Sequence, residues 1–422
     1  MREGWKISAL RDCCQIKPPK KQVRDLLSPG DMVSFVPMSD LGIREKGLNA
    51  TEDRPFRSVS GSYTYFADGD VLLAKITPCF ENGKLGIAQG LTNGVGFGSS
   101  EFIVFRPDRS LDAAYLFYFL SQDNFRDAGA SVMSGAVGHK RVPKEFIEGC
   151  PIPLPPLPEQ KRIVAILDEA FAGIDTAVAN TEKNLANARE LFESYLNSVF
   201  SQRGEGWVEK PLEKFVDSIS TGPFGSLLHK SDYVSDGVPL VNPINIVGDK
   251  IVPDQRKMIN GDVRRRLQTY VLKEGDVVIA RRGEIGRCAV VTDLQNGWVC
   301  GTGCFFIRPV GATAPTFLAH LLRSVGYRKE LERLSSGATM LNLSNKALSN
   351  LRVSMPGIRE QKNAVEQVSD LSAQCQAVES IYQQKLTALA ELKQSLLQKA
   401  FSGELTADHK DVPNPALKEE IA

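Results

Sequence analysis

The chain has 422 residues, of which 42% are apolar, and its 51 Lys and Arg nearly balance its 50 Asp and Glu. This length and apolar content are sufficient for two or more domains with buried cores. No run approaches the roughly 18 consecutive apolar residues of a membrane span, and no charged-then-apolar leader opens the chain, so we expect a soluble protein of the cytoplasm.

Residues 1–150 form the first predicted domain. Short β-like runs alternate with glycine-rich turns, and a helical pattern follows over residues 112–127. This mixture predicts an α+β fold. The segment carries 19 Lys and Arg against 18 Asp and Glu, so its net charge is only +1.

Residues 151–204 predict a long helix that follows a stiff entry. Five prolines fall within residues 151–158, and the last suits the first turn of a helix, where a missing N–H costs little. No further proline occurs as far as Phe200, and small or apolar residues recur at steps of three and four, the spacing of a coiled-coil seam. The seam positions are Leu167, Ala170, Ile174, Ala177, Thr181, Leu185, Ala188, Phe192, Tyr195 and Val199.

Residues 205–352 predict a second α+β domain, residues 353–404 a second long helix and residues 405–422 a polar tail. The second domain carries 20 Lys and Arg against 15 Asp and Glu, so the globular parts are the ones expected to touch a polyanion. Two helices of equal length indicate an intramolecular coiled coil; the alternative is two amphipathic helices on separate cores. The second seam is Val365, Val368, Leu371, Cys375, Val378, Tyr382, Leu386, Leu389, Leu392 and Leu396.

The two halves of the chain repeat each other. Gly-Trp at residues 4–5 recurs at 206–207, Gly-Asp-Val at 69–71 recurs at 275–277, and Ser-Gly-Ala at 134–136 recurs at 336–338. Glu-Gln at residues 159–160 recurs at 360–361, and Phe-Ser at 200–201 recurs at 401–402. The offset stays between 201 and 206 over nearly the whole chain, which chance does not produce. The shared landmarks set the backbone while the residues between them differ, so one scaffold presents two different surfaces.

Catalytic motifs are missing from the sequence. It contains no GxxxxGK[ST] phosphate loop, and Asn-Pro-Ile-Asn at residues 242–245 resembles the Asn-Pro-Pro-Tyr motif of amino-methyltransferases only superficially. Eight cysteines form no CxxC pair and only four histidines occur, so neither a metal site nor a catalytic triad is expected. The stretch GPFGS at residues 222–226 is either a plain turn or a tight loop beside a ligand.

This architecture resembles the specificity subunit of Type I restriction-modification enzymes. The resemblance is carried by the paired proline-to-helix segments PPLPEQ (residues 155–160) and PGIREQ (356–361), the paired Phe-Ser ends, the Gly-Trp openings and the Gly-Asp-Val strands. It covers essentially the whole chain. The segment before the second helix keeps only Pro356, so it departs from the usual proline-rich pattern.

The resemblance implies a non-catalytic chain with two target recognition domains, each recognising one half of a split site in double-stranded DNA. Two antiparallel helices between them would set the distance between the half-sites and dock two methyltransferase subunits that modify adenine at N6. No cofactor is implied in this chain: S-adenosylmethionine would be bound by the methyltransferase subunits, and ATP and Mg by the restriction subunits.

Base contacts need Arg, Lys, Asn, Gln or Ser at the edges of a groove, and phosphate contacts need Lys or Arg. We prefer Lys75 and Arg281 because they occupy matching repeat positions. The candidates in the first domain are Lys20, Lys21, Arg57, Lys75, Lys84, Lys140 and Arg141, and those in the second are Ser226, His229, Lys230, Arg264, Arg265, Arg266, Arg281, Arg282 and Arg287.

Two other functions are compatible with the residues alone. One is a coiled-coil adaptor with no role at DNA, and the other is a single-chain DNA methyltransferase whose motifs have diverged. If the helices act as a ruler, four residues inserted within Ala177–Ala188 would add ~6 Å and rotate one domain by roughly 40°.

Overall fold

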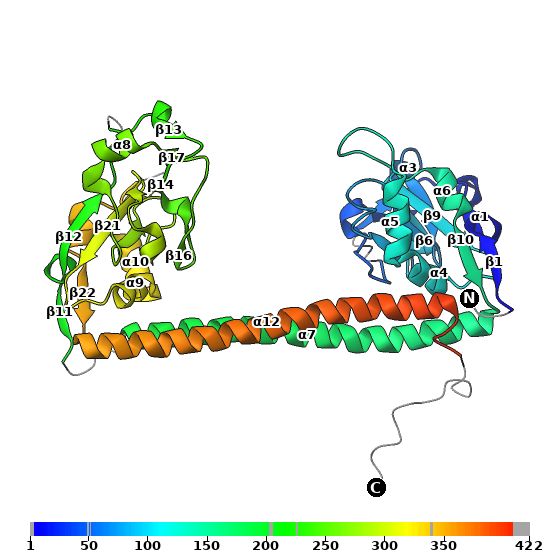
Figure 1. Cartoon of the computed structure of the whole chain (residues 1–422). Helices are drawn as coiled ribbons and strands as arrows, with labels where there is room; N and C mark the ends of the chain where they lie inside the picture. The colour runs from blue at the N-terminus through cyan, green and yellow to red at the C-terminus, as the bar shows by residue number, and fades with distance from the viewer. Residues whose placement is uncertain are drawn as a thin grey trace, which may run out of the picture. The chain divides into compact units, whose positions relative to one another are not determined.

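A computed structural model describes residues 4–48, 50, 52–201, 206–224, 227–337 and 341–407. The chain divides into two compact units, and each is described by itself. The first unit comprises Met1–Thr181 and Gln384–Ala422, and the second comprises Glu182–Gln383. Each unit contains a globular head and part of each long helix (Figure 1). This division cuts across the long helices, so the boundaries predicted for the five segments stay a prediction.

The head of the first unit is built on two four-stranded sheets. Their strand orders are β2-β9-β6-β7 and β4-β3-β8-β5, and a separate ladder pairs β1 with β10. The strands are β1 (Lys6–Ala9), β2 (Cys14–Ile16), β3 (Met32–Val36), β4 (Glu52–Pro55), β5 (Thr64–Ala67), β6 (Val71–Ala74), β7 (Leu85–Ile87), β8 (Val95–Gly98), β9 (Phe102–Pro107) and β10 (Pro151–Leu154). The helices are α1 (Leu10–Cys13), α2 (Lys21–Arg24), α3 (Phe56–Val59), α4 (Ala113–Leu120), α5 (Asp123–Ser131) and α6 (Lys144–Gly149), with short 3-10 helices η1 (Met38–Asp40) and η2 (Thr92–Gly94).

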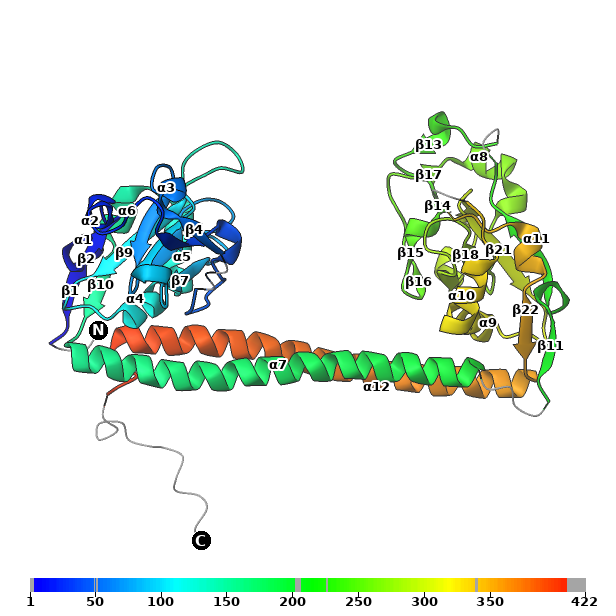
Figure 2. The same ribbon diagram turned by 180° about the vertical axis from the view of Figure 1, so that it is seen from behind.

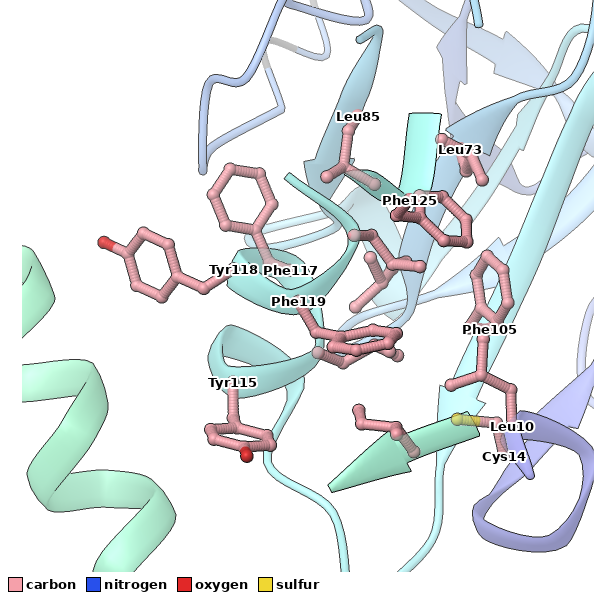
Figure 3. Close-up of a cluster of buried hydrophobic side chains, with 14 of the residues drawn as sticks. Leu10, Cys14, Leu73, Leu85, Phe105, Tyr115, Phe117, Tyr118, Phe119 and Phe125 are labelled. Atoms are coloured by element: carbon pink, nitrogen blue, oxygen red, sulfur yellow. The ribbon is translucent and has the colours of Figure 1, made fainter. Parts of the chain in front are cut away.

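The alternation of side chains along β6 explains the layered core. Val71 and Leu73 pack on the side of α4, whereas Leu72 and Ala74 belong to the cluster beneath the second sheet. Both faces of the strand are therefore covered, and all four side chains are buried. Figure 3 shows the aromatic residues of α4 in the first of these clusters, to which Leu10 and Phe105 also belong.

The second head repeats this plan with a different second sheet. Its first sheet has the order β12-β21-β18-β19, the same topology as in the first head, and its second has the order β13-β17-β14-β20. The strands are β11 (Val208–Pro211), β12 (Val216–Thr221), β13 (Tyr233–Val234), β14 (Val238–Val241), β15 (Ile246–Val247), β16 (Lys250–Ile251), β17 (Met258–Ile259), β18 (Val277–Ala280), β19 (Cys288–Val290), β20 (Val299–Cys300), β21 (Cys304–Pro309) and β22 (Arg352–Met355). The helices are α8 (Gly261–Arg266), α9 (Pro315–Arg323), α10 (Val325–Arg333) and α11 (Asn345–Ser349), with 3-10 helices η3 (Leu212–Lys214), η4 (Lys230–Asp232), η5 (Pro243–Asn245), η6 (Gln268–Tyr270) and η7 (Asp293–Gln295). The predicted α+β class is confirmed.

The long helices α7 (Leu157–Ser201) and α12 (Ile358–Ser402) have 45 residues each and lie side by side in both views (Figures 1 and 2). In the first unit Asp175 pairs with Lys393, and in the second Arg189 pairs with Glu379 at 3.0 Å. Within the second unit Tyr195 contacts Gln367 and Ala188 contacts Cys375, so the α12 numbers rise as the α7 numbers fall. The helices are therefore antiparallel, as the family resemblance implied.

Burial confirms most of the predicted seam. Every seam position of α7 is buried or half-buried, and so are those of α12 except Val378 and Leu392, which are 38% and 46% exposed. None of the helices in the described part of the chain is long and apolar enough to span a membrane.

A buried glutamine joins each head to the start of its helix, which explains the repeated Glu-Gln pair. Gln160 donates to the carbonyls of Ser110 and Pro155, both at 2.8 Å, and accepts from the amide of Asp112 at 2.8 Å. Gln361 makes the corresponding three bonds to Ala312 at 3.1 Å, Pro356 at 2.8 Å and Ala314 at 2.8 Å. The side chains are 0% and 1% exposed, so they fix the angle at which head and helix meet.

The Gly-Asp-Val repeat places a buried aspartate in each head. Asp70 accepts two hydrogen bonds from Arg106, both 2.7 Å long, and Asp276 accepts two from Arg308 at 3.2 and 3.5 Å. Burial raises the pKa of Asp276, and the amide of Lys273 and the charge of Arg308 oppose this rise only in part. The Gly-Asp-Val sequence therefore recurs because each head uses its aspartate in the same buried pair with an arginine.

The residues that directly follow the second long helix contact the first unit. The amide of Leu405 donates to Lys399 at 3.0 Å, and Thr406 is only 2% exposed and hydrogen-bonds to Glu159. These contacts hold the first residues of the tail on the first unit, while residues 408–422 lie outside the described part.

Candidate nucleic-acid interface

Strand register places Lys75 and Arg281 at the end of each head that is remote from the buried glutamine, Gln160 or Gln361, that joins the head to its helix. In the first head Ala74 lies opposite Phe102, and β9 then runs toward Ser110 and the glutamine joint. Lys75 therefore leaves the sheet at the opposite end. In the second head Ala280 lies opposite Cys304, which gives Arg281 the same place. We call this end of each head the distal edge; it also carries the β-bridges that pair Ser134 with Arg141 and Ser336 with Asn342.

At the first distal edge, Lys75 and Arg141 share one carboxylate. Arg141 donates to both oxygens of Glu101 at 2.8 and 2.9 Å, and the ammonium of Lys75 lies 3.9 Å from the same group. The bonds from Arg141 lower the pKa of Glu101, and burial lowers the pKa of Lys75. Two cations and one anion leave this cluster with a net positive charge, and the carboxylate of Glu101 offsets part of the charge of Lys75.

The remaining first-head candidates divide into structural and exposed groups. Lys84 donates to the carbonyls of Met38 at 2.7 Å and Leu41 at 2.9 Å, so it holds a loop together. Lys20 donates to the carbonyls of Ser60 at 3.1 Å and Gly61 at 2.5 Å, and burial lowers its pKa. The other three candidates are exposed and are Lys21, Arg57 and Lys140.

In the second head, several of the arginines predicted to bind DNA pair with nearby acids or carbonyls. Arg266 pairs with Asp232 at 2.7 Å, Arg265 pairs with Asp262, and Arg287 pairs with Glu284. Arg264 donates to the carbonyl of Gly297 at 3.0 Å. His229 caps η4, Lys230 is exposed, and Ser226 lies outside the described residues.

Arg281 and Arg282 differ sharply in exposure although they are neighbours. Arg281 is only 7% exposed, whereas Arg282 is exposed. The guanidinium of Arg281 lies over the rings of Phe224, at 5.6 Å, and Phe305, at 5.2 Å, and donates to Asn342 at 3.3 Å. Burial lowers the pKa of Arg281, with a contribution from the charge of Arg282. The structure thus makes Arg282 the accessible member of the pair.

Two residues of the distal edges were missed by the sequence reasoning. Lys17 is exposed and lies near both Lys20 and Lys75, because its charge contributes to the lowered pKa values of both. Phe224 is 54% exposed beside Arg281. The Pro-Pro-Lys-Lys run at residues 18–21 and the GPFGS stretch were signals, but only the fold shows which end of the head they occupy.

These groups are donors, cations and an exposed ring, which suit phosphate and base contacts. Within the described ranges, no three His, Cys, Asp or Glu side chains lie close enough together to hold a metal ion. The arrangement can bind an anionic partner through both heads.

The family described as "Type I restriction modification DNA specificity domain" matches residues 2–185 and 229–388. The chain is 36% identical over 225 residues to the Type I restriction enzyme EcoEI specificity subunit of Escherichia coli, a match over 52% of this chain and 37% of that protein. The matched stretch is thus well under half of that relative's length.

Two solved structures share the fold. The HsdS subunit from Thermoanaerobacter tengcongensis superposes with a TM-score of 0.63 and 20% identity, covering 96% of this chain and 98% of that one. A chain from a structural study of the assembly and conformational transition of the type I R-M system gives a TM-score of 0.79 at 22% identity, covering 96% and 99%. Together with the family match over both halves, these findings show that the chain belongs to the Type I restriction-modification DNA specificity family.

Proposed function

We propose that this chain is the DNA-specificity subunit of a Type I restriction-modification complex and recognises a bipartite, asymmetric DNA site. The observation that carries the proposal is the doubled architecture: each half has a head, a glutamine joint and a long helix in the same order. Family membership supports it.

Two heads on one scaffold suit a site made of two different halves. The first sheets of the heads have the same topology, whereas the second sheets and the charged groups of the distal edges differ. Each head would therefore meet its own half-site with its own set of side chains. The exposed cations Lys21, Arg57, Lys140, Lys230 and Arg282 are the groups we expect to reach phosphates or base edges.

The paired helices would fix the gap between the half-sites and dock two methyltransferase subunits, with restriction subunits joining for cleavage. In this proposal the chain itself holds no cofactor and is not an enzyme. S-adenosylmethionine would belong to the methyltransferase subunits, and ATP and Mg to the restriction subunits. The complex would work in the cytoplasm on double-stranded DNA.

The experiment is to co-express the full-length chain with the methyltransferase subunit of its system and map N6-methyladenine across host DNA. The proposal predicts methylation at one split motif with a gap of constant length. Without this chain the same methyltransferase should leave that motif unmethylated. A stable complex that binds no DNA would support the adaptor instead, and methylation by this chain alone would support the single-chain enzyme.

A further inference from the structure

The loop that carries Phe224 is fixed on its near side by close backbone packing. A Cβ at Gly222 would lie 2.0 Å from the carbonyl oxygen of Gly301, so only glycine fits there. The amide of Gly222 donates to Cys304 at 3.1 Å, and the hydroxyl of Thr302 donates to the carbonyl of Pro223 at 2.7 Å. The residue before Phe224 is therefore held rigidly against the turn that precedes β21.

The far side of the loop is also tied to the head. The amide of Leu227 donates to the carbonyl of Phe224 at 2.8 Å, and Arg266 donates to the carbonyl of Leu227 at 3.3 Å. Arg266 is itself held by Asp232 at 2.7 Å. Pro223 and Leu227 are therefore both hydrogen-bonded to other parts of the head, while more than half of the surface of Phe224 stays in contact with water.

Arg281 supports the ring of Phe224 from within the head. Its guanidinium is within the ~6 Å range of a cation–π contact to both Phe224 and the fully buried Phe305. The Nη1 atom of Arg281 is buried without a hydrogen-bond partner among the residues that the structure describes. A buried donor without a partner costs free energy, and the contacts of the guanidinium with the two rings offset part of that cost.

The first head lacks this arrangement at the equivalent position. The amide of Lys75 donates to the carbonyl of Glu101, and the amide of Arg281 donates to that of Gly303, each at 3.0 Å. The carboxylate that lies beside Lys75 is thus replaced by a glycine in the second head. The second distal edge keeps its positive charge and adds an exposed ring, with Arg282 exposed next to it.

We propose that Phe224 contacts the bases of the second half-site, as an apolar wedge at a base step, and that Arg281 is a positioning residue that holds the ring from behind. This inference rests on the proposed function. Proteins insert apolar side chains between base steps where basic groups hold the neighbouring phosphates, and Arg282 and Lys230 would provide those groups. The surrounding cations favour DNA over a protein surface as the occupant.

The test measures binding of the complex to a labelled duplex that carries its mapped methylation site, over a series of salt concentrations. Phe224→Ala should weaken binding by roughly ten- to a hundredfold at every salt concentration, because an aromatic contact to a base is lost and no phosphate contact is. Phe224→Leu keeps an apolar wedge and should recover part of the loss. Arg282→Ala should instead lower the slope of log affinity against log salt by about one.

Arg281→Gln should weaken binding like Phe224→Ala, leave the salt slope unchanged, and add little when the two changes are combined. A lower slope for Arg281→Gln would overturn the positioning role, because it would indicate a direct phosphate contact. Urea unfolding of each variant identifies any that fail to fold; Phe224→Ala removes an exposed side chain and keeps the test informative.

The matched control is Leu294→Ala. Leu294 is 75% exposed and follows β19, whose Val290 lies opposite Val277, so it occupies the end of the head away from Arg281. Its removal should leave binding within twofold. If Phe224→Ala does the same, or weakens assembly with the methyltransferase instead, the inference is wrong. If the unmodified complex recognises no site at all, the proposed function fails first, and the two failures are thereby distinguished.

Discussion

Replacing the buried glutamine of one joint by leucine should loosen that head from its helix. Gln160→Leu keeps the volume and the helix but removes the acceptor for Asp112 and the donors to Ser110 and Pro155. Two carbonyls and one amide then lose a partner. The bonds to Ser110 and Asp112 are only part-buried, so water can replace some of them, and we expect a loss of about 2–4 kcal/mol in the free energy of unfolding.

Hydrogen exchange localises the effect, and urea unfolding followed by circular dichroism gives its size. Gln160→Leu should speed exchange at the amide of Asp112 and not at that of Ala314, and Gln361→Leu should do the reverse. Gln374→Leu, an exposed position on α12, is the control and should stay within about 0.5 kcal/mol. If Gln160→Leu behaves like this control, the joint contributes nothing and the explanation of the Glu-Gln repeat is refuted.

The next three predictions concern Asp70, which is buried, and His320 and Lys84, which are half-buried. Asp70→Asn should cost about 2–4 kcal/mol by urea unfolding and more than Asp276→Asn, because its arginine partner lies closer; equal costs would contradict this. Burial lowers the pKa of His320 to about 4, so the unfolded chain binds a proton that the fold does not between pH 6.5 and pH 4. Stability should fall by up to about 3 kcal/mol as the pH drops through that window, and His320→Gln should remove that part of the pH dependence. Lys84→Met should lower the free energy of unfolding by about 1–3 kcal/mol without changing the salt dependence of DNA binding. Lys21→Met should lower the slope of log affinity against log salt and leave the free energy of unfolding unchanged.

The sequence was sufficient to predict the order of heads and helices because that order is written in long periodic patterns. A three-and-four spacing sustained over ten positions leaves few alternatives to a coiled coil, and the constant offset of the repeat fixes the doubling. Val378 and Leu392 are exposed although the seam was predicted to include them. On one long helix, steps of three and four can connect apolar residues that lie on different faces.

The candidate site was less predictable because exposure depends on the fold around each residue. Lys84 and Arg281 have the same charge as Lys21 and Arg282, yet the first two are held by carbonyls or rings inside the head. Nothing in the local sequence separates these pairs. The sequence places Phe224 only within a stretch that is either a turn or a tight loop beside a ligand, since its exposure depends on the backbone contact between Gly222 and Gly301.

If the heads recognise sequence while the paired helices measure the gap, longer helices should give a longer gap. The most direct test inserts four residues into both helices where the two compact units divide, after Thr181 in α7 and after Gln383 in α12, and maps N6-methyladenine again. Four residues add ~6 Å and roughly 40° of rotation, equivalent to about two base pairs of B-DNA at 3.4 Å each. The account predicts the same two half-sites separated by a longer gap. Methylation of the parental site with its gap unchanged would contradict it.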